Sequence, residues 1–241
     1  DARHITLHKT SSTPHGGGGP GSGPVVLSEA LAPFAPLPFT LRTAEGVTHL
    51  VGEEDAAAIV PGESFGSRSF GRMTAFHGQM GMFTRALTYI LSHGADGLRQ
   101  VAEDAVLNAN YVLRRVEDVL VAPFAASGPC MHEALFSDAG LPEGFTTLDI
   151  AKGLIDEGVH PMTVYFPLVV RGAMLVEPTE TESRAGLGRF IASLRSLAER
   201  AGRSDESLKS APHLAPRRRL DETQAARKPV LVWREPASAA D

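Results

Sequence analysis

A stretch rich in glycine and proline, residues 15–24, is the feature that most constrains this 241-residue chain. It can form neither a helix nor the interior of a regular strand, and its backbone can pass very close to a ligand. Lys9 lies a few residues before it, at the end of a short run of alternating apolar residues. The amine of a lysine can hold an aldehyde cofactor as a Schiff base. We therefore expect a binding site here; a solvated lysine beside a flexible linker is the alternative.

The composition is that of an ordinary globular protein, with 43% apolar and 21% charged residues. This length suggests one large domain or two small ones. The formal net charge of −5 argues against binding nucleic acid, which requires a basic face. No membrane span is expected, because no run of about 18 apolar residues occurs. The single cysteine, Cys130, fits a reducing, cytoplasmic setting.

Apolar periodicity predicts helices joined by short strands. Helices are expected at residues 79–91, 96–119, 148–157 and 182–201, with Gly94 ending the first. Strands are expected at residues 4–7, 25–27, 163–166 and 173–176, and near 47–51 and 131–136. The remainder of residues 31–62 is rich in proline and is expected to be irregular. Because the first residues already have a strand pattern, we expect the chain to be a piece of a longer polypeptide.

The sequence around Lys9 resembles the P-protein of the glycine cleavage system, the pyridoxal-phosphate-dependent glycine decarboxylase. The resemblance rests on His4, on His8-Lys9-Thr10 and on residues 14–21. Further blocks agree in the same order, at residues 105–111, 130–133, 148–152, 163–168 and 177–183. Each block is modestly specific, whereas their joint order is very specific. The closest match is to the carboxyl-terminal half of the second subunit of two-subunit bacterial enzymes.

The resemblance implies an α/β protein with the aspartate-aminotransferase-like fold of pyridoxal-phosphate-dependent transferases. Residues 1–91 would be the carboxyl-terminal part of the large cofactor domain, residues 92–202 the small α+β domain, and residues 203–241 a tail. Most of the large domain would then lie upstream of this sequence. That upstream part would supply the partner of the pyridine nitrogen, the ring-stacking residue and much of the phosphate site.

The resemblance also assigns the residues of the site. Lys9 would bind pyridoxal 5′-phosphate covalently, and His8 and Thr10 would contact the cofactor. Because neighbours in a strand point to opposite faces, plain structural hydrogen bonding is the alternative for these two residues. The substrate entrance is expected to be lined by His15, Gly16, Gly17, Gly18 and Gly19.

The implied reaction is the decarboxylation of glycine, with transfer of the aminomethyl group to the lipoyl arm of H-protein. The implied partners are glycine, lipoylated H-protein and P-protein subunit 1. The alternative is a non-catalytic fragment or assembly half that cannot hold the cofactor alone. No metal site is expected, because Cys130 and His132 make a poor ligand set. We expect Cys130 to be a buried strand cysteine.

Overall fold

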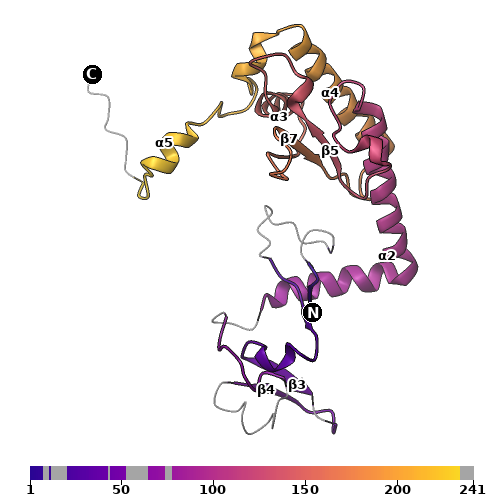
Figure 1. Cartoon of the computed structure of the whole chain (residues 1–241), viewed down its shortest axis with the longest axis vertical. Helices are drawn as coiled ribbons and strands as arrows, with labels where there is room; N and C mark the ends of the chain where they lie inside the picture. The colour runs from indigo at the N-terminus through magenta and orange to yellow at the C-terminus, as the bar shows by residue number, and fades with distance from the viewer. Residues whose placement is uncertain (8–10, 12–20, 43, 53–64, 74–77, 234–241) are drawn as a thin grey trace. The chain divides into compact units, whose positions relative to one another are not determined.

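The computed structural model describes residues 1–7, 11, 21–42, 44–52, 65–73 and 78–233 (Figure 1). The chain divides into two compact units, Asp1–Leu98 and Arg99–Asp241, called unit 1 and unit 2 below. The predicted boundary at residues 91 and 92, between a cofactor domain and a small domain, stays a prediction. No helix within the described ranges combines the length and the apolar character that a membrane crossing needs.

The described residues of unit 1 form two small antiparallel sheets. Their paired strands are β1 (Ala2–His4) with β2 (Val25–Leu27), and β3 (Phe39–Arg42) with β4 (Thr48–Val51). Strand β2 confirms its prediction, whereas β1 lies slightly earlier than the predicted strand at residues 4–7. Strand β3 was predicted to be irregular chain, which is wrong. It begins directly after Pro38, and a proline before the first strand residue removes no hydrogen bond from the ladder.

The longest helix, α2 (Met80–Val116), is interrupted at Gly94. The backbone of Gly94 has φ 65° and ψ −174°, which is not helical. Glycine adopts a positive φ without the steric cost that a Cβ brings. The prediction of two helices on either side of Gly94 is therefore confirmed. The second helix ends at Val116 instead of the predicted Val119.

Unit 2 is a small α+β assembly around a three-stranded antiparallel sheet (Figure 1). The strands, in the order β5–β7–β6, are β5 (Ala134–Ser137), β7 (Ala173–Val176) and β6 (Thr163–Val164). Its main helices are α3 (Thr147–Asp156) and α4 (Arg184–Gly202). The core joins the second half of α2, both helices and the sheet; its fully buried members include Val112, Val116, Phe136, Ile150, Leu154, Met174, Leu194 and Leu197. The predicted small α+β architecture matches this arrangement.

Two predicted strands of unit 2 are shorter than expected. The strand predicted near residues 131–136 begins only at Ala134. The strand predicted at residues 163–166 ends at Val164, because Tyr165 has φ 57° and leaves the extended conformation. Short 3₁₀ helices lie at Ala32–Phe34 (η1), Ala125–Ser127 (η2), Asp138–Gly140 (η3) and Glu206–Ser210 (η4).

Residues 206–219, named the strap here, pack on the rest of unit 2 although they were predicted to belong to a tail. Leu208 is fully buried in the core. The carboxylate of Asp156 accepts hydrogen bonds from the backbone N–H groups of His213 (2.7 Å) and Leu214 (2.8 Å). Arg219 Nη2 donates to Asp149 Oδ1 over 2.6 Å. The strap was missed because its few apolar residues form no periodic pattern.

The carboxylate of Asp205 fixes the start of the strap and gives a pH-dependent prediction. It accepts hydrogen bonds from the hydroxyl and the backbone N–H of Ser207 and from Arg200 Nε. The Ser207 hydroxyl, followed by Arg200, lowers the pKa of Asp205 from 3.8 to about 2. The folded state therefore favours the carboxylate. Its stabilising effect is present above the unfolded-state pKa of about 3.9 and is lost as the pH falls toward 2.

We expect Asp205→Asn to melt below the wild type at about pH 7 and the two melting temperatures to converge near pH 2. Thermal unfolding followed by circular dichroism across this range measures the difference. Glu222→Gln, a charge change at an exposed residue of the helix α5 (Glu222–Arg227), is the matched control. A gap between Asp205→Asn and the wild type that stays constant down to pH 2 would contradict the role of the carboxylate.

Candidate functional site

The predicted cofactor residues His8, Lys9 and Thr10 lie outside the described residues, as do the predicted entrance residues His15 to Gly19. Their roles stay predictions. The described chain leads up to this segment from both sides, through β1 and Leu7 before it and through Ser22 and β2 after it. The structure therefore describes the residues on either side of the predicted site.

The two flanking strands are paired beyond their formal ends. The backbone N–H of Ile5 donates to Pro24 O, and that of Leu7 donates to Ser22 O, each over 3.0 Å. At Gly23 the two backbones come so close that a Cβ would lie 2.1 Å from Ile5 O. A backbone oxygen cannot yield as a flexible side chain can, so this position requires glycine. Lys9 therefore lies two residues after Leu7, whose backbone is held by this pairing.

A group of titratable side chains gathers in unit 2: His132, Glu133 and Glu177. Antiparallel pairing places Ala134 opposite Val176, so the residue before β5 and the residue after β7 share one end of the sheet. His132 Nε2 lies 4.0 Å from Glu133 Oε1 and 3.9 Å from Glu177 Oε1. The three donor atoms lie within 4.8 Å of one another, and the side chains are exposed or half-buried. Because these side chains are largely exposed, a solvated polar cluster is sufficient to explain the grouping.

Two asparagines of α2 hold the loops on either side of this cluster. Asn110 Nδ2 donates to Cys130 O over 2.7 Å, and Asn110 Oδ1 accepts from the backbone N–H of Cys130 over 3.0 Å. Asn108 Nδ2 donates to Thr179 O over 2.9 Å. The sequence analysis assigned no role to either asparagine and missed both anchors. The two side chains lie two residues apart on the helix, so they point in different directions and reach different loops.

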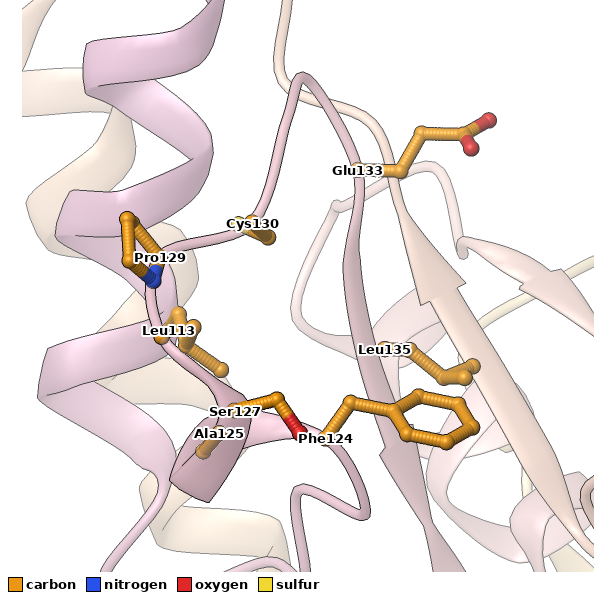
Figure 2. Close-up of a pocket in the computed structure, with 9 residues that line it drawn as sticks. Leu113, Phe124, Ala125, Ser127, Pro129, Cys130, Glu133 and Leu135 are labelled. Atoms are coloured by element: carbon orange, nitrogen blue, oxygen red, sulfur yellow. The ribbon is translucent and has the colours of Figure 1, made fainter.

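Cys130 lies in the loop before β5, so its predicted place within a strand is wrong. It is half-buried and lines a pocket of about 180 Å³ together with Leu113, Phe124 and Leu135 (Figure 2). Burial raises the pKa of its thiol. The thiol therefore stays protonated and poorly nucleophilic. The pocket is smaller than typical small-molecule sites, which begin at about 300 Å³.

A groove of about 760 Å³ runs between the segment after α3, the end of β7 and the first half of α4. Val159, Met162, Leu175 and Phe190 contribute apolar surface, and the polar lining residues are Glu157, His160, Thr163, Glu177, Glu182, Arg189 and Ser193. Glu177 belongs both to this groove and to the cluster with His132. The mixed lining suits an extended ligand with polar and apolar parts.

The close approach at Gly23 gives a testable prediction. We expect Gly23→Ala to break the pairing next to it, so that the amides of Ile5 and Leu7 exchange at least about tenfold faster. Hydrogen–deuterium exchange mass spectrometry of the peptide containing residues 1–7 measures this change. Gly188→Ala in α4 is the control, because a Cβ there meets no atom within 4 Å. Unchanged exchange in Gly23→Ala would refute the close approach.

Comparison with known proteins identifies relatives along nearly the whole chain. Residues 101–213 match the family model described as "Glycine dehydrogenase, C-terminal domain". A probable glycine dehydrogenase (decarboxylating) subunit 2 of Caulobacter vibrioides is 63% identical over 99% of this chain. The proteins of the same name from Oceanobacillus iheyensis and Thermotoga petrophila are 45% and 43% identical, each over 97% of it. The chain spans 44%, 45% and 46% of these three relatives, respectively, which is less than half of each.

The structural comparison agrees with this kinship. A solved glycine decarboxylase (P-protein) of the glycine cleavage system, in inhibitor-bound form, matches with a TM-score of 0.55. The match covers 78% of this chain and 41% of that one at 18% identity, so it shows a shared fold of mixed helices and strands. Taken with the sequence matches, it shows that this chain belongs to the family of glycine dehydrogenase (decarboxylating) subunit 2, of which it represents a carboxyl-terminal part.

Proposed function

We propose that the chain is the carboxyl-terminal part of an oxidoreductase that decarboxylates glycine with pyridoxal 5′-phosphate and passes the aminomethyl group to the lipoyl arm of H-protein. One observation carries the proposal: the identity of 63% with a glycine dehydrogenase (decarboxylating) subunit 2 over 99% of the chain. Because the chain covers 44% of that relative, the activity is proposed for the longer protein. Its partners are glycine, lipoylated H-protein and P-protein subunit 1, and its place is the cytoplasm.

The proposal includes the aspartate-aminotransferase-like fold of pyridoxal-phosphate-dependent transferases. Unit 1 would be the carboxyl-terminal part of the large cofactor domain, and unit 2 the small domain. The α+β arrangement of unit 2 and the long helix that leads into it support this assignment. The upstream part of the subunit would complete the large domain.

The chemistry of the side chains that follow Leu7 fits pyridoxal 5′-phosphate. Lys9 offers an amine for the covalent bond, and Thr10 offers a hydroxyl that can donate to a phosphate oxygen. The ladder between Leu7 and Ser22 provides a fixed backbone from which this segment departs. When bound, the cofactor supplies the electron sink that loss of the glycine carboxyl group requires.

The remaining residues have supporting roles in the proposal. His8 contacts the cofactor beside Lys9. His15 opens the glycine-rich stretch, and Gly16, Gly17, Gly18 and Gly19 leave room at the entrance because they carry no side chain. An entrance without side chains suits both a small substrate and the narrow lipoyl arm.

Lys9 is the decisive residue for a test in the longer protein, with the upstream part restored. Borohydride reduction followed by peptide mapping should place the pyridoxyl group on Lys9. Lys9→Ala should abolish exchange of the glycine carboxyl carbon with bicarbonate, because no other amine replaces it. Lys152→Ala, at the next lysine in the sequence, is the control and should keep the exchange. An adduct on another lysine would disprove the assignment.

The 241-residue chain by itself should be almost inactive. By family resemblance, the partner of the pyridine nitrogen, the stacking group and much of the phosphate site come from upstream. The chain should therefore bind pyridoxal phosphate weakly and show no strong absorbance band when it is added. It should exchange the glycine carboxyl carbon with bicarbonate at the background rate. Stoichiometric cofactor and a normal exchange rate in the purified chain would show that these groups do not come from upstream.

A further inference from the structure

The loop between β6 and β7 presents apolar side chains to solvent. We name residues 165–171 the hairpin loop. Phe166, Leu168 and Val169 are 55%, 87% and 85% exposed. Single exposed apolar residues are common on proteins, whereas several together indicate a contact surface. The hairpin loop is therefore an exposed apolar surface that is suited to contact with another apolar segment.

A second apolar segment follows the strap near the end of the described chain. Val230, Leu231, Val232 and Trp233 are between 67% and 88% exposed. The residues that join them to the strap, 220–229, are exposed throughout. The helix α5, which lies in this connection, has no buried residue. The segment combines a large ring with β-branched side chains, which favours burial against another apolar surface.

The strap ends at the base of the hairpin loop. Arg219 Nη2 donates to Asp149 Oδ1 over 2.6 Å, and Asp149 lies in the first turn of α3. In the same turn, Thr147 Oγ1 donates to Gly172 O over 2.6 Å, and Gly172 directly follows the hairpin loop. Arg219 and Gly172 are thus held by one helical turn. Residues 220–233, which follow the strap, therefore begin beside the exposed hairpin loop.

We propose that Val230–Trp233 docks on the hairpin loop and covers its apolar side chains. The connection is long enough, because residues 220–229 span up to about 35 Å when extended and less with α5 folded. A tether of this length holds the segment near the loop at an effective concentration in the millimolar range. An external protein has to reach the same surface without that advantage. This docking does not depend on the proposed enzymatic activity.

Trp233 is the single tryptophan of the chain, so tryptophan emission, excited at a wavelength that tyrosine does not absorb, reports on this segment alone. In the dilute 241-residue chain we expect acrylamide to quench Trp233 about threefold less efficiently than free N-acetyltryptophanamide, with emission shifted to the blue, because docking buries the indole. Leu168→Ser combined with Val169→Ser should return both quantities most of the way to the free values. Both residues are over four-fifths exposed, so the fold should survive the change.

Leu107→Ser is the matched control, because Leu107 is an exposed leucine of unit 2 that belongs to α2 and not to the hairpin loop. It should leave the fluorescence unchanged. Quenching of the wild type as efficient as that of the free compound would overturn the proposal. So would protection that the double variant does not remove. Protection that appears only as the chain concentration rises would show that a second copy covers the segment, and would overturn it as well.

Discussion

The first turn of α3 ties together the separate parts of unit 2 through buried polar groups. Asp149 accepts the backbone N–H and hydroxyl of Thr146 with one carboxylate oxygen and Arg219 with the other. Thr147, fully buried, donates its backbone N–H to Asp138 and its hydroxyl to Gly172 O. A buried charge or hydroxyl is costly without partners, and a network in which each group is satisfied also makes the arrangement specific. One turn of helix thereby fixes the end of β5, the start of β7 and the strap.

The two asparagines of α2 perform the equivalent task at the other end of the sheet. They bind backbone groups of Cys130 and Thr179, which lie 20 and 71 residues away along the chain. As a result, three of the sequence blocks that carry the family resemblance, residues 105–111, 130–133 and 177–183, meet in space. Their order along the sequence pointed to the family, and their hydrogen bonds explain why the blocks converge. The cluster of His132, Glu133 and Glu177 is a product of that convergence.

Much of unit 2 could be predicted because its elements are strongly periodic. Helix α4, the interruption at Gly94 and strand β7 follow from local patterns of apolar residues and glycine. The strap could not be predicted, since Arg219 finds its carboxylate 70 residues away and only the folded chain brings them together. The proximity of His132 to Glu177 depends on the register of β5 against β7, which no local pattern specifies. The assignments of Lys9 and its neighbours came from family resemblance and still depend on it.

Gly172 shows how this packing restricts the evolution of the sequence. Its backbone has φ 64°, and a Cβ would lie 1.8 Å from Asp138 Oδ1. Any side chain at 172 would displace the carboxylate that accepts the N–H of Thr147. A shorter residue at 138 would make room but would leave that buried N–H without its acceptor. Substitution of either residue alone would destabilise the protein. Evolution could therefore replace this pair only through a less stable intermediate sequence.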